Sequence, residues 1–117
     1  KIPLIDENIS MKKALKIMSN KKLGTLVVIN KKKQTTGIVT DGQVRRFSEK
    51  NVDLNILKVR DIMTKNPIKI EKDTLATKAL SIMNQKKITI LCIYKGNKKS
   101  KTIGIIHIHN ILDKKIY

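Results

Sequence analysis

Aromatic side chains are nearly absent from this chain. Its 117 residues contain no Trp, one Phe and two Tyr. Proteins that bind single-stranded nucleic acid stack successive bases on several exposed rings, so this composition argues against that class. The apolar 40% of the chain consists mainly of aliphatic residues, including twenty Ile. A chain of this length buries roughly two-thirds of its unfolded surface, which predicts a substantial aliphatic core.

Long apolar runs and a leader segment are also missing. The longest nearly apolar stretch, residues 103–108, is interrupted by His107. It is far shorter than the ~20 residues that span a bilayer, and no basic-then-apolar signal peptide opens the sequence. We therefore expect a cytoplasmic domain with no membrane partner. Because the first residue is Lys1, we expect a piece of a longer protein.

Cysteine and catalytic motifs are scarce. The single cysteine, Cys92, excludes an internal disulfide. Its apolar neighbours in residues 90–94 (ILCIY) predict a small buried hydrophobe rather than a nucleophile. The sequence has no Gly-rich phosphate loop and no Ser/His/Asp set. His107 and His109 lie two apart, but two imidazoles without a third ligand rarely make a zinc site. We expect binding rather than catalysis, with no metal and no cofactor.

One sign of charge dominates. Lys and Arg number 26 against 9 Asp and Glu, a net charge of +17, which suggests a polyanionic partner such as nucleic acid. Only three of these cations are Arg, however, and readers of bases and phosphates favour the bidentate Arg fork. The lysines are scattered, with small clusters at residues 31–33 and 98–101 that are typical of hairpin tips. A solvated basic surface is the favoured interpretation, and nucleic-acid binding is an alternative.

The chain contains an internal duplication. At a shift of 65 residues, segment 13–26 (KALKIMSNKKLGTL) falls on 78–91 (KALSIMNQKKITIL), with eight identities in fourteen positions. The match resumes at a shift of 67, where residues 36–39 (TGIV) fall on 103–106 (IGII). Two copies are too few for a solenoid, and each half alone would be marginally stable. We expect two copies packed face to face about a pseudo-two-fold axis.

Each copy begins with an amphipathic helix. Apolar residues recur at three-and-four spacing in both copies, at Met11, Ala14, Leu15 and Met18 and at Leu75, Ala79, Leu80, Ile82 and Met83. The expected N-caps are Ser10 in the first copy and Asp73 or Thr74 in the second.

A β-hairpin and a closing helix follow in each copy. Two apolar runs flank a Lys/Asn/Gly-rich turn, at residues 25–29 and 36–40 and again at 89–94 and 102–106. The closing helices are expected at residues 41–49 and 109–115. Short extended pieces precede the copies at residues 3–5 and 67–70, where Pro suits an edge strand. The fold class is therefore α+β, with a small sheet packed against two helices in each copy.

The opening of the second copy resembles a known family. Residues 59–67 (VRDIMTKNP) are similar to the opening of the CBS (cystathionine-beta-synthase-type) domain, and both copies carry its Gly-hydrophobic-hydrophobic segment before the last helix. The whole chain thus resembles a tandem CBS pair, or Bateman module. We expect a first repeat at residues 1–50, a linker at 51–58 and a second repeat at 59–117. Residues 50–66 carry one apolar turn, at 59–63, and otherwise suggest a crossing linker.

A narrower resemblance rests on residues 37–46 (GIVTDGQVRR), 52–54 (VDL) and 104–112 (GIIHIHNIL). These segments are similar to the carboxy-terminal CBS pair of bacterial D-arabinose 5-phosphate isomerases, which feed Kdo and lipopolysaccharide biosynthesis. The resemblance implies that an amino-terminal sugar-isomerase domain of the same protein carries out the aldose–ketose isomerisation. This fragment itself is then not an enzyme.

The CBS resemblance also implies a ligand cleft between the copies, with a Thr/Ser-x-x-Asp segment at the mouth of each last helix. There the hydroxyl contacts a phosphate at a helix N-terminus, and the Asp holds the ribose hydroxyls of an adenosine nucleotide. Here Thr40 holds the hydroxyl position and Gln43 replaces the Asp, while the second copy has His107 and Asn110. Amides lose charge-assisted strength. The pathway's cytidine-activated sugar acid, CMP-Kdo, is therefore an alternative effector to an adenosine nucleotide.

The expected ligand-binding residues come from both copies. They are Leu23, Gly24, Thr25, Thr40, Gln43, Arg45, Arg46, Lys65, Asn66, Ile68, Ile88, Ile90, His107, His109 and Asn110. Arg45, Arg46 or Lys65 would meet a phosphate or carboxylate. For Thr40 and Asp41, the alternative is that they form only an N-cap pair. For His107 and His109, we expect one ring to pack at the cleft and the other to cap or hydrogen-bond the closing helix, and the alternative is that they reach toward the isomerase domain.

Three functions follow from these observations. The favoured one is a regulatory CBS pair that binds a small anionic effector, shifts the conformational population of the enzyme and supports a homodimer or homotetramer. The second is a purely structural dimerisation module without a ligand. The third is a basic nucleic-acid-binding domain.

Overall fold

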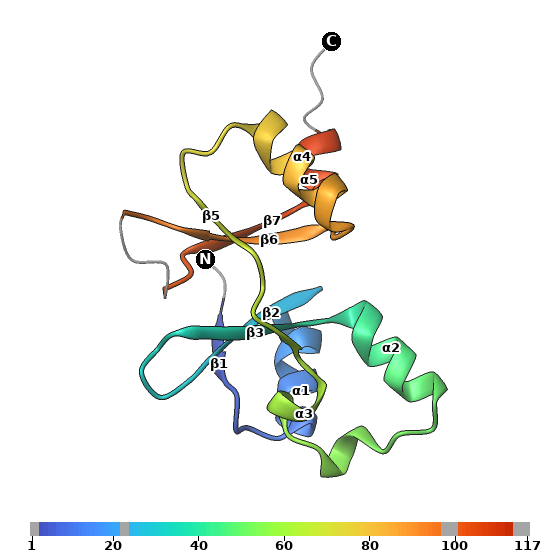
Figure 1. Cartoon of the computed structure of the whole chain (residues 1–117). Coiled ribbons are helices and arrows are strands. Elements are labelled where there is room, and N and C mark those ends of the chain that lie inside the picture. Colours follow the sequence, from blue (N-terminus) through green and yellow to red (C-terminus); the bar gives the residue numbers. More distant parts are fainter. Residues whose placement is uncertain (1–2, 22–23, 97–100, 114–117) are drawn as a thin grey trace. The chain divides into compact units, whose positions relative to one another are not determined.

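The computed structural model describes residues 3–21, 24–96 and 101–113 (Figure 1). Contacts divide the chain into two compact units, and the chain passes from one to the other between Pro67 and Ile68. Each unit is built on its own small sheet, with strand orders β1-β2-β3-β4 and β5-β6-β7. The α+β class predicted from the sequence is confirmed.

The first unit contains most of the elements. They are β1 (Leu4–Asp6), α1 (Met11–Lys21), β2 (Thr25–Ile29), β3 (Thr35–Thr40), α2 (Asp41–Glu49), the 3-10 turn η1 (Leu54–Ile56), α3 (Val59–Ile62) and β4 (Thr64–Lys65). Strand β1 pairs with β2 in parallel, while β2 with β3 and β3 with β4 are antiparallel. The hairpin of residues 25–29 and 36–40 and the closing helix at 41–49 are thus confirmed.

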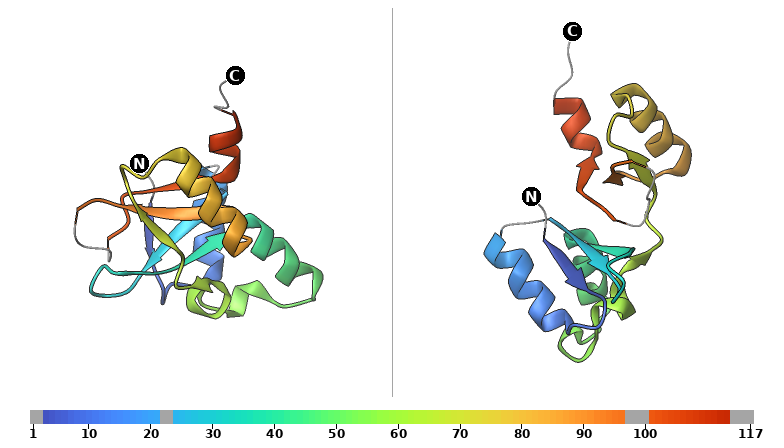
Figure 2. Two further views of the ribbon diagram at one scale, coloured as in Figure 1. Left: turned by 45° about the horizontal axis from the view of Figure 1, so that its top comes forward. Right: turned by 90° about the vertical axis from the view of Figure 1, so that its left-hand side faces the viewer.

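The second unit repeats part of this plan. Its elements are β5 (Lys69–Glu71), α4 (Ala76–Lys86), β6 (Ile90–Tyr94), β7 (Gly104–His107) and α5 (Ile108–Asp113). Strand β5 pairs with β6 in parallel and β6 with β7 antiparallel, which confirms the second hairpin. Helices α4 and α5 lie on the same side of this sheet in both orientations (Figure 1 and Figure 2). The predicted final residues of the closing helix, 114 and 115, lie outside the described residues.

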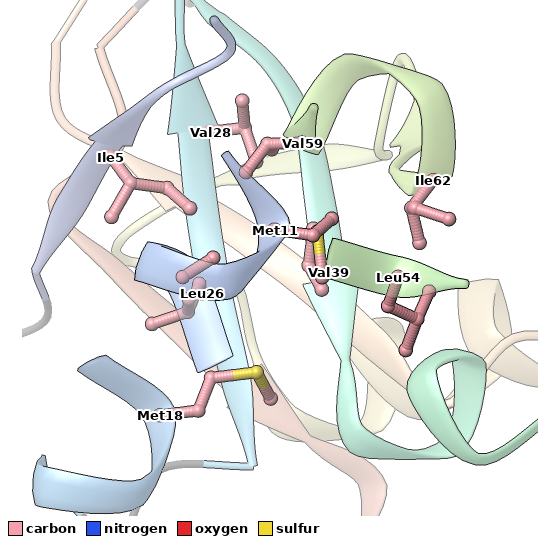
Figure 3. Close-up of a cluster of buried hydrophobic side chains, with 10 residues drawn as sticks. Ile5, Met11, Met18, Leu26, Val28, Val39, Leu54, Val59 and Ile62 are labelled. Carbon is pink, nitrogen blue, oxygen red and sulfur yellow. The ribbon is translucent and has the colours of Figure 1, made fainter. Parts of the chain in front are cut away.

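The core of the first unit is an aliphatic layer between its sheet and its helices (Figure 3). Met11, Ala14 and Met18 of α1 are buried there, as their spacing predicts. They pack with residues from the strands and from the segment after α2, namely Ile5, Leu26, Val28, Val39, Leu54, Val59 and Ile62. Fully burying one side chain of this size stabilises the fold by about 1.5–3 kcal/mol.

The caps of the two first helices differ. Ser10 caps α1 as predicted, because its hydroxyl accepts a hydrogen bond from Lys13 N at 3.1 Å. The predicted cap of α4 at Asp73 or Thr74 is wrong, since the N-cap residue is Leu75, without a side-chain cap. The Glu71 carboxylate accepts from Asp73 N, and the Glu71 carbonyl accepts from Thr74 N. This turn delays the helix, and Leu75 is 73% exposed rather than part of the apolar stripe.

Residues 59–65 belong to the first compact unit although they open the second repeat by sequence. Val59 and Ile62 are buried in the core of the first unit, and β4 pairs with β3 at Ile38↔Thr64 and Gly37↔Lys65. Gly37 makes this approach possible, because a Cβ there would lie 2.6 Å from Met63 Sδ and 2.8 Å from Thr64 O. The helical turn and strand that follow the predicted linker are therefore packed elements of this unit.

Candidate functional site

The first candidate site lies where β3 passes into α2. We call the N-terminal end of α2, at residues 40–43, the first helix mouth. Thr40 is the N-cap, with extended backbone at φ −115° and ψ 156°. Its hydroxyl accepts from Gln43 N at 3.2 Å, and Gln43 Oε1 accepts from Thr40 N at 2.8 Å. These reciprocal bonds form a capping box, which satisfies two backbone donors that the helix itself leaves free. Thr40 thus takes the N-cap role that the sequence left open as an alternative, while Asp41 is the first residue of the helix.

The Gln43 side chain also reaches away from its own helix. Gln43 is only 8% exposed, and its Nε2 donates to Ile62 O at 3.4 Å and to the hydroxyl of Thr64. The oxygen and the nitrogen of the amide are therefore both engaged within the protein. Sequence reasoning missed Thr64, although it stands in the VRDIMTKNP segment and presents a hydroxyl.

Strand β2 supplies the opposite wall of this helix mouth. Thr25, a buried residue, is the direct cross-strand partner of Thr40. Asp41 N donates to Gly24 O at 2.9 Å, which fixes the first residue of α2 against the start of β2. A Cβ on Gly24 would lie 3.5 Å from Asp41 Oδ2, so the Asp41 carboxylate stands directly over this glycine.

Three cations of the first unit are exposed near these elements. Arg45 and Arg46 lie on α2 and Lys65 on β4. Arg46 folds back along its helix, because its Nη1 lies 3.5 Å from the position of a Cβ built on Gly42. Beside Lys65, Asn66 has a left-handed backbone at φ 53° and donates from its N to Thr36 O at 3.1 Å. The unit thus combines exposed positive charge with a helix N-terminus.

A shallow hollow adjoins the helix mouth. It has a volume of about 240 Å³ and is lined by Leu15, Met18, Ser19, Asp41 and Val44. Three of these five residues are apolar, and Asp41 connects the hollow to the N-terminal turn of α2. A flat apolar portion of a ligand would fit here more readily than a charged one.

The second unit has an equivalent site with different side chains at the N-terminal end of α5, residues 107–110, which is the second helix mouth. Ile108 N donates to Thr89 O at 2.7 Å, as Asp41 N does to Gly24 O. Asn110 Oδ1 accepts from His107 N at 2.8 Å, so Asn110 takes the capping role of Gln43. His107 Nδ1 accepts from His109 N at 3.1 Å, which confirms that one of the two histidines caps the closing helix.

The two histidine rings stack on each other. Their centroids are 4.7 Å apart and their planes differ by 18°. Because His107 Nδ1 accepts a hydrogen bond, the neutral ring carries its proton on Nε2. Among the described residues, no three His, Cys, Asp or Glu side chains gather into a group that could hold a metal ion.

The predicted site residues fall into one group for each unit. The first unit holds Gly24, Thr25, Thr40, Gln43, Arg45, Arg46, Lys65 and Asn66, and the second holds Ile68, Ile88, Ile90, His107, His109 and Asn110. Ile90 is the cross-strand partner of His107, and Ile68 and Ile88 pack on one apolar cluster. Leu23 lies outside the described residues.

Cys92 is a buried core residue and not a candidate site residue. It is fully buried, as predicted. Burial raises the pKa of its thiol, while a hydrogen bond with Thr102 and the charge of Lys69 lower it to a smaller extent. A buried, protonated thiol is a poor nucleophile.

No helix within residues 3–21, 24–96 and 101–113 is both long and apolar enough to cross a bilayer.

Comparison with known sequences identifies relatives. The CBS-domain profile matches residues 1–50 and 59–116. The chain is 33% identical to arabinose 5-phosphate isomerase KdsD of Yersinia pestis over 111 residues, which are 95% of this chain and 33% of that enzyme. It is 40% identical to the uncharacterized protein RP505 of Rickettsia prowazekii with the same coverage. The chain thus spans about a third of the length of the curated relatives it matches.

Solved structures share the fold. A putative signal-transduction protein with CBS domains from Burkholderia ambifaria has a TM-score of 0.81 and 22% identity, over 100% of this chain and 88% of that one. A hexameric CBS-CP12 protein from bloom-forming cyanobacteria has a TM-score of 0.84 and 24% identity, over 97% and 65%. CBSX2 in complex with AMP has a TM-score of 0.77 and 23% identity, over 97% and 86%.

Proposed function

The chain belongs to the CBS-domain family, of which it carries two copies, and on this premise we propose that it is the regulatory part of a longer cytoplasmic enzyme of the arabinose 5-phosphate isomerase type. The observation that carries this proposal is the match of 95% of the chain to one third of KdsD. The remaining two thirds of such an enzyme would supply the isomerase domain and with it the catalysis. The chain itself would bind an effector.

The effector that we propose is a small anion of the nucleotide or nucleotide-sugar class. The N-terminus of α2 presents backbone donors and a partial positive charge, and Arg45, Arg46 and Lys65 add exposed cations in the same unit. CBSX2, a relative in fold, binds AMP, which supports an adenosine nucleotide. CMP-Kdo is the alternative, because no carboxylate stands at position 43 or 110 to accept from two ribose hydroxyls.

Effector binding would act through the oligomer. A ligand shifts an equilibrium only by its differential affinity for two conformations, which typically amounts to ~1–3 kcal/mol. We propose that the pair supports a homodimer or homotetramer in which this coupling operates. The hexamer of the CBS-CP12 protein shows that a protein with this fold assembles into oligomers.

A structural module without a ligand is the second candidate. The observation in its favour is that Gln43 and Asn110, which occupy the ribose-binding positions implied by the family, hold their amide oxygens on the backbone of their own N-caps. In that case the pair would serve oligomerisation alone.

Thermal unfolding distinguishes the two candidates. The protein is melted at physiological salt with AMP, ATP, CMP or CMP-Kdo in large excess. A ligand at ~100 times its dissociation constant adds ~2.7 kcal/mol, which raises the midpoint by several degrees in a domain of this size. A shift with one compound supports the regulatory function and identifies the ligand class. Unchanged midpoints with all four support the structural module.

A pair of lysine variants tests the proposed residues. Lys65→Ala removes an exposed cation beside the first helix mouth, and Lys78→Ala removes an equally exposed one from α4. Loss of a charge-assisted hydrogen bond weakens binding by about tenfold or more. Calorimetry with the compound that raises the unfolding midpoint should therefore show a reduced affinity for Lys65→Ala and an unchanged affinity for Lys78→Ala. Equal affinities of the two variants would remove Lys65 from the site.

A further inference from the structure

The two sheets differ at one edge although the repeats are duplicated. In the first sheet β3 lies between β2 and β4, whereas β7, its counterpart, is the last strand of its sheet among the described residues. Gly37 and Ile38 of β3 pair with Lys65 and Thr64. The equivalent positions in β7 are Gly104 and Ile105, which are paired on the β6 side alone within the described part of the chain.

No contact and no backbone angle in the described structure requires a glycine at position 104. Gly37 is required, because a Cβ there would overlap Met63 Sδ and Thr64 O. A Cβ on Gly104 would meet, of the described atoms, only Ile93 Cδ1 at an ordinary 3.9 Å. Gly104 is also absent from the positive-φ positions. Glycine weakens a strand interior and often marks the close approach of another backbone. Gly104 therefore indicates a segment that lies alongside β7 at close distance, as residues 63–64 lie close to Gly37 of β3.

The same edge is apolar and incompletely covered. Gly37, Ile38 and Val39 of β3 are buried, while every residue of β7 is half-buried. Ile103, just before β7, is 47% exposed. Free sheet edges are normally protected by charged side chains, Pro or a bulge, and the sequence of β7, GIIH, contains neither charge nor Pro.

We infer that the edge of β7 at Gly104–His107 receives a segment with the pattern of residues 59–66, a helical turn followed by a short strand, supplied by a part of the longer protein outside this chain. The occupant is of this kind because residues 59–66 cover the equivalent edge of the first sheet. Its source is outside the chain because the sequence contains one such segment, and that segment already pairs with β3. The inference rests on the proposed origin in a longer protein and not on effector binding.

A fusion protein tests this inference. A second copy of residues 59–66 is attached behind residue 117 through a flexible Gly/Ser linker of about 20 residues, which has a reach of roughly 25 Å. The control fusion carries the same eight residues in scrambled order. Amide hydrogen exchange is measured at β7 and β3, and thermal unfolding is followed without any nucleotide, so the outcome is independent of effector binding.

Strand addition predicts slower exchange in β7 and a rise in the unfolding midpoint of about 4 °C or more over the scrambled fusion. Exchange in β3 should stay unchanged, because β4 already covers it. Identical exchange in β7 and equal midpoints for the two fusions would overturn the inference, since the linker makes the added segment intramolecular.

Two glycine variants provide a matched control. In the chain without a fusion, Gly104→Ala should leave the unfolding midpoint unchanged or raise it slightly, while Gly37→Ala should lower it by several degrees. In the fusion, Gly104→Ala should abolish the added protection of β7. If, in the chain without a fusion, Gly104→Ala lowers the unfolding midpoint as much as Gly37→Ala does, glycine at position 104 is required by contacts within its own unit. That result would contradict the inference.

Discussion

The side-chain amide of Gln43 donates a hydrogen bond to the hydroxyl of Thr64, 21 residues further along the chain. The same amide accepts from the N-cap backbone of α2 and donates to the carbonyl at the end of α3. One buried side chain therefore joins a helix N-terminus, a helix C-terminus and an edge strand. A displacement of Thr64 would therefore break a hydrogen bond of the residue that caps α2.

Replacing Gln43 by alanine should destabilise the protein measurably. The variant loses the capping box, and the half-buried Thr40 N and the buried Ile62 carbonyl lose their Gln43 partner, which costs about 1–3 kcal/mol. Asn110→Ala is the control, because that residue is exposed and caps a shorter helix, so its loss should cost about 0.5–1 kcal/mol. Urea denaturation measures both values. Equal losses would contradict the special position of Gln43.

Residues of the segment that opens the second repeat should stabilise the first unit. Ile62 is 3% exposed in the core of that unit, and Ile62→Ala should cost about 2–5 kcal/mol. Hydrogen exchange should accelerate in β1, β2, β3 and α1, while β6 stays protected. Ile56→Ala, at a side chain that is 78% exposed, is the control and should change little. Loss of protection confined to β6 and β7 would refute this assignment.

Cys92 should make stability fall at alkaline pH. Burial raises the pKa of the folded thiol above its ordinary value of 9.0, so the unfolded chain ionises first. The contribution of the thiol is complete below the unfolded pKa and is lost as pH rises toward the folded pKa. The free energy of unfolding, measured between pH ~8 and ~10.5, should decline more steeply in the natural protein than in Cys92→Ala. Parallel curves would contradict this.

The thiol of Cys92 should also resist chemical modification. A protonated, fully buried sulfur reacts slowly, so a thiol reagent at neutral pH should modify the folded protein far more slowly than the protein in urea. Equal rates in the two conditions would show that Cys92 is accessible.

The charge of +17 should produce salt-sensitive, nonspecific binding to polyanions. Affinity for duplex DNA should fall by several orders of magnitude between about 50 and about 200 mM salt. Polyglutamate serves as the comparison and should show a similar salt dependence, because both interactions depend on scattered lysines. Tight, DNA-selective binding at physiological salt would favour the nucleic-acid alternative instead.

The elements that depend on local sequence were predicted well. The apolar stripe of α1, the two hairpins and α2 at Asp41–Glu49 follow from side-chain periodicity and turn residues within a few positions. The N-caps Ser10 and Thr40 follow from their residue types. The cap of α4 was predicted wrongly, because the Glu71 carboxylate organises the preceding turn and the helix begins beyond it.

The contacts of Gln43 could not be predicted in this way. Its capping bond to Thr40 lies within one helical turn, but its bonds to Ile62 and Thr64 cross 19 and 21 residues. A sequence pattern does not reveal which distant hydroxyl a buried amide meets, because that depends on how α3 and β4 pack on the sheet. The same reason explains why Thr64 was missed.

The sequence by itself determined the duplication, the α+β class, the family and the residues at the two helix mouths, since periodicity and repeated motifs are local properties of the chain. Only the tertiary structure decided that residues 59–65 pack with the unit before them rather than the one they open by sequence. Burial of Val59 and Ile62 against a particular sheet, and the close approach of β4 to Gly37, depend on complementary surfaces that form only when the chain is folded.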